Sequence, residues 1–258
     1  MRILISNDDG IEALGLELLV DAASRVSADV WVVAPDGNRS SVGHAITMRR
    51  PFSITEVSDQ RFSCSGTPAD CVIVALAWVF AGEPKPDLVL AGINDGLNVA
   101  EDIAYSGTIA VAREAAFWGI PAISVSRPKA LGRYGPSQLD WLARLLGHFW
   151  TARSGWAREG HWLNVNLPET VPAPVREADV GRDKIAREVA VVHRNGAHTT
   201  LQTLAGRYAT AGDGDENSLT RAGYACVTNL HWFGTARLSP EILPSLNSAT
   251  VERRGGVA

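Results

Sequence analysis

The chain has 258 residues, of which 46% are hydrophobic, 20% charged and 7% aromatic. This balance is ordinary for a folded protein, and a chain of this length can bury a sizeable core, so intrinsic disorder is excluded as its main character. With 24 basic and 28 acidic residues, the formal net charge is −4. That charge provides no basic surplus for binding a nucleic-acid polymer or an anionic membrane.

Several features bear on the cellular compartment. The longest uncharged apolar run, residues 71–82, has 12 residues, which is too short to span a bilayer. Two aspartates stand at positions 8 and 9, a pattern that does not fit a secretory signal peptide. The three cysteines, Cys64, Cys71 and Cys226, form no CxxC motif, and their odd number argues against a disulfide framework. We therefore expect a soluble cytoplasmic protein.

Strand and helix signals alternate over the first 170 residues. Apolar and β-branched runs predict strands, whereas apolar residues at i, i+4 spacing and a Ser-Gly-Thr-Pro start signal predict helices. The expected strands are Arg2–Ser6 and residues 29–34, 87–93, 120–126 and 162–167. The expected helices are residues 14–26, 69–80, 105–118 and 136–150.

Strands that are apolar on both faces and separated by helices are typical of a parallel sheet covered on both sides. We therefore predict the α/β class, with a Rossmann-like, doubly wound, mostly parallel sheet. A late strand over residues 224–230 is expected to rejoin it. Residues 1–258 then form one domain, with a core of about 1–170 and 213–235 and a tail of about 236–258.

The pattern changes after residue 170. Apolar runs at 188–193 and 199–204 flank Arg194-Asn195-Gly196-Ala197, and Asn-Gly between such runs is a strong hairpin signal. We predict an appended β-hairpin extension over about 171–212, which serves oligomerisation or covers the site.

Polar residues follow three of the expected strands. They occupy positions 7–9, 35–41 and 93–96. Because ligands bind at the carboxyl ends of the strands in an open parallel sheet, these three sets are expected to converge on one edge.

Asp8 and Asp9 are the most distinctive of these residues. Adjacent carboxylates repel each other by about 4 kcal/mol at roughly 4 Å and an effective dielectric of about 20, and a divalent cation would offset that repulsion. Oxygen donors without a nearby His or Cys cluster suit Mg²⁺ or Mn²⁺ better than zinc. The alternative is that one aspartate caps the next helix and the other is solvated.

A second feature is Tyr105-Ser106-Gly107-Thr108, which opens an expected helix. Free backbone N–H groups, the helix dipole and two hydroxyls there predict an anion site, although an ordinary helix cap is the alternative. A carboxylate-held cation beside an anion pocket is the arrangement that phosphoryl chemistry requires.

Two further motifs leave alternatives open. Ser65-Gly66-Thr67 is either a second phosphate contact or a helix cap. His44, in the polar loop, either touches substrate or fills the loop.

Five ordered motifs resemble one known family. With SNDDG at 6–10, VVAPDGNRSS at 32–41, SGTPADCV at 65–72, AGIN at 91–94 and YSGTIAVAREA at 105–115, the chain resembles the SurE family of metal-dependent 5′/3′-nucleotidases. Weaker similarity continues at 164–168 and 213–230. The resemblance implies a Rossmann-like phosphohydrolase that converts nucleoside 5′- and 3′-monophosphates to nucleoside and phosphate.

The resemblance also assigns residues. It implies one divalent metal per subunit, held by the following residues: Asp8, Asp9, Ser40 and Asn94. It places the phosphate at Ser106, Gly107 and Thr108, with Asn98 nearby. It further implies a homodimer or homotetramer formed through C-terminal extensions.

The chain departs from the family pattern at three places. Leu14 stands where proline is common, Gly37 stands where a basic residue often precedes Asn38, and residues 212–216 replace a usual Thr-Asp pair. These departures concern the substrate preference and the oligomer interface.

The leading hypothesis is a phosphomonoesterase in which Asp8 or Asp9 orients or deprotonates a metal-activated water. One alternative is a phosphatase that forms an aspartyl-phosphate, with Asp8 as nucleophile. That chemistry normally uses an Asp-x-Asp pattern and a lysine on the phosphate, but Lys85, Lys129 and Lys184 lie in no motif. The other alternative is a nucleotide-sensing module without catalysis, which gives the paired aspartates no role.

Overall fold

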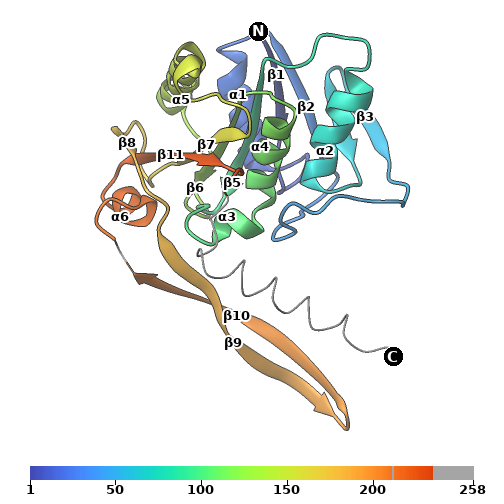
Figure 1. The fold of residues 1–258 in the computed structure, drawn as a ribbon, viewed down its shortest axis with the longest axis vertical. Helices are drawn as coiled ribbons and strands as arrows, with labels where there is room; N and C mark the ends of the chain where they lie inside the picture. Colours follow the sequence, from blue (N-terminus) through green and yellow to red (C-terminus); the bar gives the residue numbers. More distant parts are fainter. Residues whose placement is uncertain (211, 235–258) are drawn as a thin grey trace, which may run out of the picture.

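A nine-stranded, mostly parallel sheet forms the centre of the part of the chain that the structure describes (Figure 1). The structure is a computed structural model that describes residues 1–210 and 212–234, without the side chains of 183–187 and 205–210. The tail expected over 236–258 lies outside these residues.

The sheet has the strand order β3-β4-β2-β1-β5-β6-β7-β11-β8. The bounds in that order are Ile54–Ser58, Arg61–Cys64, Asp29–Pro35, Arg2–Ser6, Leu88–Asp95, Ala122–Arg127, His161–Asn166, Ala225–His231 and Val175–Glu177. All strands from β4 to β7 pair in parallel, and antiparallel pairs occur at β3–β4 and β7–β11. The predicted fold class is therefore confirmed.

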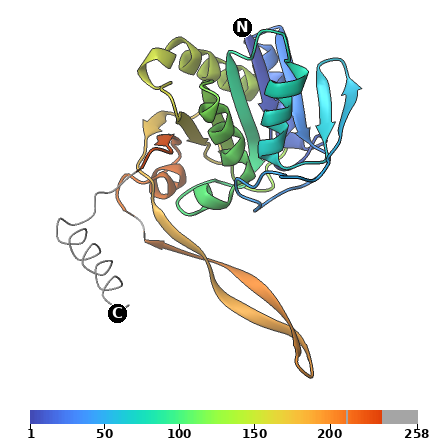
Figure 2. The same ribbon diagram turned by 45° about the vertical axis from the view of Figure 1, so that its right-hand side comes forward.

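Helices cover both faces of this sheet (Figures 1 and 2). On one face α1 (Leu14–Ser24) and α5 (Pro136–Thr151) pack on a core that includes Ile3 and Ile5. On the other face α2 (Pro68–Val74) and α4 (Gly107–Phe117) pack on a core that includes Leu4. Successive side chains of a strand point to opposite faces, so an apolar β1 contributes to both cores.

Two of the expected helices are subdivided. The helix expected over 69–80 is α2 followed by a π-helical turn, Ala75–Val79. The helix expected over 105–118 is two helices, because Ser106 has an extended backbone between α3 (Asp102–Tyr105) and α4. Ser106 is thereby the N-cap of α4 rather than part of a continuous helix.

The region after residue 170 differs in extent from the predicted extension. The segment expected as hairpin from 171 contains β8, which pairs with β11 and belongs to the main sheet. The hairpin itself is β9 (Arg182–Asn195) and β10 (His198–Thr210), which projects away from the sheet (Figure 2). It is followed by α6 (Glu216–Arg221).

Candidate active site

Three strand ends meet at the carboxyl edge of the sheet, as the sequence predicts. The Asp95 amide, at the end of β5, donates to Asp9 Oδ2 at 3.2 Å. Asn38 Nδ2, from the loop after β2, lies 3.5 Å from Asp9 Oδ1. The Arg39 amide of the same loop donates to the backbone carbonyl of Asp8 at 2.7 Å. The two aspartates after β1 are therefore enclosed by both neighbouring strand ends.

Asp8 lies against the start of α4. Its side chain is only 3% exposed. Its Oδ2 accepts a hydrogen bond from the Gly107 amide at 3.1 Å, and its Oδ1 accepts one from the Thr108 hydroxyl. The partial positive charge at a helix N-terminus stabilises a carboxylate in this position.

This close approach requires glycine at position 107. A Cβ atom on Gly107 would lie 2.6 Å from the Cβ of Asp8 and 2.8 Å from the Cγ of Pro68. Any larger residue would displace either Asp8 or the start of α2. The glycine of the Ser106-Gly107-Thr108 motif therefore allows Asp8 to contact the start of α4.

Asn94 is oriented by its own loop. Its Nδ2 donates to the Gly96 carbonyl at 2.7 Å, which leaves its Oδ1 facing the Thr108 hydroxyl at 3.3 Å. Thr108 has one hydroxyl proton, which it donates to Asp8 over the shorter contact, so the Asn94 oxygen is adjacent to this hydroxyl without receiving the full hydrogen bond. The Asn94 oxygen thus lies on the same side of the site as the buried carboxylate.

Burial changes the protonation of both aspartates. Removal from water raises the pKa of Asp8 from 3.8 to about 6; hydrogen bonds from Thr108 and Gly107 oppose this shift, and the charge of Asp9 adds to it. Burial likewise raises the pKa of Asp9, where the Asp95 amide and Lys129 oppose the shift and the Asp95 charge adds to it. The site therefore disfavours two negative charges unless a cation accompanies them.

The oxygen donors at this edge fit a hard divalent cation. Within residues 1–210 and 212–234, no three His, Cys, Asp or Glu side chains are grouped so as to hold a metal. A cation here would depend on two carboxylates and on neutral oxygens from Asn94 and Ser40. Ser40 is exposed, and its amide donates to Asn38 Oδ1 at 3.0 Å within the loop that borders Asp9. Such an all-oxygen set suits Mg²⁺ or Mn²⁺.

The residues expected to bind phosphate divide into two groups. Ser106 Oγ accepts the Ile109 amide at 3.1 Å, so its own proton remains available for another acceptor. Asn98 is 4% exposed and its Nδ2 donates to Ser126 Oγ at 2.8 Å. The backbone amide of Asn98 donates to Asn166 Oδ1 at 2.9 Å. Asn98 thus belongs to a buried polar network that supports the loop after β5.

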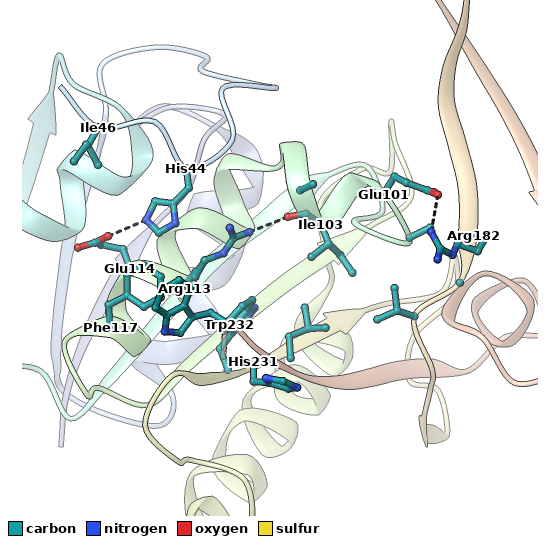
Figure 3. A pocket seen from close by; sticks show the side chains of 16 residues that line it. His44, Ile46, Glu101, Ile103, Arg113, Glu114, Phe117, Arg182, His231 and Trp232 are labelled. Carbon is teal, nitrogen blue, oxygen red and sulfur yellow. Dashed lines mark hydrogen bonds and ion pairs between the residues drawn. The ribbon is translucent and has the colours of Figure 1, made fainter. Parts of the chain in front are cut away.

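His44 lies on the flank of α4, with its ring directed at Glu114 (Figure 3). Its Nε2 is 2.8 Å from Glu114 Oε2, and its ring stacks on Phe117 with centroids 5.3 Å apart. These residues line a pocket of about 1010 Å³ whose lining includes neither Asp8 nor Asp9.

Thr67 is a helix cap. Its hydroxyl accepts the Asp70 amide at 3.2 Å, and the Asp70 carboxylate accepts the Thr67 amide at 2.8 Å. This is a complete capping box at the start of α2. Of the two alternatives for Ser65-Gly66-Thr67, the cap is therefore the one observed.

One charged residue near the site belongs to none of the sequence motifs. Lys129, in the loop after β6, lies so close to Gly96 that a Cβ there would be 3.1 Å from Lys129 Cε. Its charge also lowers the pKa of Asp9. The only sequence signal for Lys129 is its place just beyond the carboxyl end of a parallel strand.

These features define a Rossmann-like α/β protein with an acidic, oxygen-rich site at the carboxyl edge of its sheet. The family model described as survival protein SurE matches residues 3–189, and the chain belongs to the SurE family. The resemblance seen in the sequence motifs is therefore confirmed.

Relatives and a solved structure agree with this assignment. The 5′-nucleotidase SurE of Paramagnetospirillum magneticum is 42% identical over 202 residues, which are 75% of each chain. That of Methylobacterium radiotolerans is 45% identical over 179 residues, 68% of this chain and 69% of the other. The crystal structure of the SurE protein from Aquifex aeolicus is similar with a TM-score of 0.74 and 29% identity, covering 97% of this chain and 100% of that one. In the described part of the chain, no helix has the length and apolar character needed to cross a membrane.

Proposed function

We propose that this chain is a metal-dependent phosphomonoesterase that hydrolyses nucleoside 5′-monophosphates, and 3′-monophosphates, to nucleoside and phosphate. The observation that carries the proposal is the pair Asp8 and Asp9, whose pKa values burial raises, beside the start of α4. The names of the relatives, 5′-nucleotidase SurE, support the same enzyme class.

We infer the ligands of the cation from the oxygen donors at this edge. One divalent cation per subunit, Mg²⁺ or Mn²⁺, would be held by Asp8, Asp9, Asn94 and Ser40, where it would bind a phosphate oxygen and lower the pKa of a water. Asp8 already directs both carboxylate oxygens toward α4. It therefore serves to anchor the site to the helix.

The protein side chains then position the phosphate and the water. The Ser106 hydroxyl, whose proton is not used in the cap, donates to a phosphate oxygen, and the α4 dipole stabilises the charge. Asp9 is less buried than Asp8 and orients the water, or accepts its proton, as the water oxygen bonds to phosphorus. The bond between phosphorus and the ribose oxygen breaks, and that oxygen takes up a proton.

The contacts of Asp8 bear on the aspartyl-phosphate alternative. A nucleophilic carboxylate needs a free oxygen directed at phosphorus. Both oxygens of Asp8 accept hydrogen bonds from the start of α4. Each oxygen keeps a lone pair for the proposed cation. A carboxylate shared between the helix and the cation is not free to attack phosphorus, so the proposal takes water as the nucleophile.

The test is release of inorganic phosphate from AMP, from 3′-AMP and from p-nitrophenyl phosphate, with Mg²⁺, with Mn²⁺ and with EDTA. We expect release that depends on a divalent cation. Binding of AMP without phosphate release in every metal condition would support a nucleotide-sensing module instead. Release that persists in EDTA would contradict the metal dependence.

We further propose a cytoplasmic homo-oligomer. Cys64, Cys71 and Cys226 are buried free thiols, consistent with a reducing compartment. The hairpin exposes Val191 and Leu201 by 55% and 56%, respectively. Exposed apolar residues on an isolated two-stranded ribbon favour contact with another copy of the chain.

A further inference from the structure

The loop after β6 brings a cation to the rim of the acidic site. Lys129 is exposed and follows Arg127, the last residue of β6, by two positions. A Cβ placed on Gly96 would lie 3.1 Å from Lys129 Cε and 3.7 Å from Asn94 Nδ2. The lysine stem and the Asn94 side chain therefore both lie against Gly96, in the loop after β5.

This loop is held in place from several directions. The Ala130 amide donates to Asp95 Oδ1 at 3.0 Å, and the Gly96 amide donates to the Arg127 carbonyl at 2.9 Å. The Arg127 guanidinium, only 2% exposed, donates to the carbonyls of Leu131 and Gly132 at 2.8 Å each. A buried guanidinium that bonds the loop backbone fixes the position from which Lys129 extends.

The ammonium group of Lys129 is uncommitted in the described part of the chain. Its charge acts on Asp9, yet it forms no ion pair within 4.0 Å among those residues. An ammonium has three N–H donors and is a common ligand of phosphate oxygens. Lys129 therefore stands at the β5–β6 side of the site, while the start of α4 borders Asp8.

We propose that Lys129 binds the phosphate group of the substrate from the β5–β6 side of the site. This inference rests on the proposed phosphomonoesterase function and adds a residue that determines affinity for the phosphate. The competing role is electrostatic only: Lys129 would balance the charges of Asp9 and Asp95 without touching substrate. The two roles predict different effects of removing the lysine: weaker phosphate binding if it contacts phosphate, and tighter metal binding with unchanged phosphate affinity if it acts only by its charge.

The experiment compares Lys129→Met with Lys85→Met as a matched control. Lys85 is also an exposed lysine, but it lies over the Trp118 ring at 4.8 Å, outside the site. At saturating Mn²⁺ we expect Lys129→Met to raise the KM for p-nitrophenyl phosphate about tenfold, as for the loss of one hydrogen bond to a charged group. The inhibition constant of inorganic phosphate should rise by the same factor, kcat should change less, and Lys129→Arg should retain most of the affinity.

Calorimetry provides a readout that does not depend on turnover. Binding of inorganic phosphate to the Mn²⁺-saturated protein should weaken in Lys129→Met and remain unchanged in Lys85→Met. Unchanged phosphate affinity and KM, together with tighter Mn²⁺ binding, would overturn the proposal and favour the electrostatic role. If Lys129→Met does not fold, as judged by circular dichroism, Lys129→Gln keeps the polarity and most of the stem and is expected to show the same tenfold change.

The two proposals fail separately. A wild-type protein that releases no phosphate under any metal condition would contradict the proposed function, while phosphate calorimetry still decides the role of Lys129. Conversely, an active wild-type enzyme whose Lys129→Met variant matches it in KM and phosphate inhibition would contradict the lysine contact alone.

Discussion

The carboxyl edge of the main sheet and the β9–β10 hairpin both depart from the usual distribution of polar and apolar residues, in opposite directions. At the edge, Asp8, Asn98 and Asn166 are 3%, 4% and 0% exposed. On the hairpin, Val191 and Leu201 are 55% and 56% exposed. One region buries polar groups among apolar ones, and the other leaves apolar side chains in water.

Each departure has a free-energy cost in the isolated chain. A buried polar group needs a hydrogen-bond partner, and a buried carboxylate needs a partner or a raised pKa. A two-stranded ribbon with exposed apolar residues is only marginally stable in water. Under the functions proposed above, something outside the subunit would offset each cost: a cation and a phosphate at the edge, and a second copy at the hairpin.

The largest expected effect is the loss of activity on changing either aspartate. Asp8→Asn and Asp9→Asn each remove one negative charge from the cation site, so kcat/KM for p-nitrophenyl phosphate should fall at least about 10³-fold while the fold persists. The measurement is steady-state kinetics at saturating Mn²⁺, with circular dichroism to verify folding. Asp59→Asn, at an exposed turn, is the control and should remain active. Near-normal metal-dependent turnover by Asp9→Asn would contradict the assignment of the metal site.

A second prediction measures the cost of burying Asp8. Because its folded-state pKa is raised from 3.8 to about 6, the metal-free protein loses stability as the pH rises through this interval and stays on a lower plateau above it. Two pKa units correspond to about 3 kcal/mol. In urea unfolding with EDTA, the free energy of unfolding of Asp8→Asn relative to that of wild type should therefore rise by up to about 3 kcal/mol between about pH 4 and pH 7. Parallel pH profiles for the two proteins would contradict this cost.

A third prediction concerns the neutral oxygen donors. Asn94→Ala and Ser40→Ala should weaken Mn²⁺ binding about tenfold each, with little change in thermal stability, because each removes one neutral ligand. Higher Mn²⁺ should partly restore the rate. Asn98→Ala is the contrasting variant, since its amide supports Ser126 rather than the open site. It should lower the melting temperature by several degrees and leave the Mn²⁺ affinity nearly unchanged. If neither Asn94→Ala nor Ser40→Ala shifts the Mn²⁺ dependence, these residues are not ligands.

Local pattern was sufficient to predict the sheet and its acidic edge. Ile3, Leu4 and Ile5 form an uninterrupted apolar run because the two faces of β1 are both covered, and polar residues from position 6 to the two aspartates at 8 and 9 follow it. This information lies within ten residues of sequence. The convergence of the strand ends then follows from the geometry of any parallel sheet.

Elements defined by distant pairing were not predicted. The strand β3 is largely exposed at the sheet edge and lacks an apolar alternation, and its partner β4 has only four residues. The strand β8 has only three residues, all exposed, and exists through its pairing with β11. Neither segment has a local signal as strong as that of the central strands.

The same limit applies within the site. The Asn98 amide is fixed by Asn166, which is 68 residues away in the sequence. Lys129 becomes notable only through its contact with Gly96. Both roles depend on which loops the sheet brings together, whereas the SGT motif of α4 could be recognised from residues next to one another.

The smallest expected effect on the stability of one subunit is at the hairpin. There we expect substitutions to change the oligomeric state instead. Val191 and Leu201 lie directly opposite each other on β9 and β10. Because both side chains are already exposed, the double variant Val191→Lys with Leu201→Lys should alter the stability of one subunit by no more than about 0.5 kcal/mol. If a second copy covers this surface, two introduced ammonium groups would have to be buried there, and the assembly should dissociate.

Light scattering measures this directly, with the single variant Gln202→Lys, at the next position along β10, as a control for added positive charge. Consecutive residues of a strand face opposite sides, so Gln202→Lys tests added charge away from the Val191–Leu201 face. We expect a lower solution mass for the double variant and the parent mass for the control. Replacement of residues 188–204 by a short Gly-Ser bridge should lower the mass as well, with metal-dependent turnover retained, because all four proposed metal ligands precede residue 95. A deletion variant that keeps the parent mass would show that the hairpin is not the interface, and its exposed valines and leucine would then need another explanation.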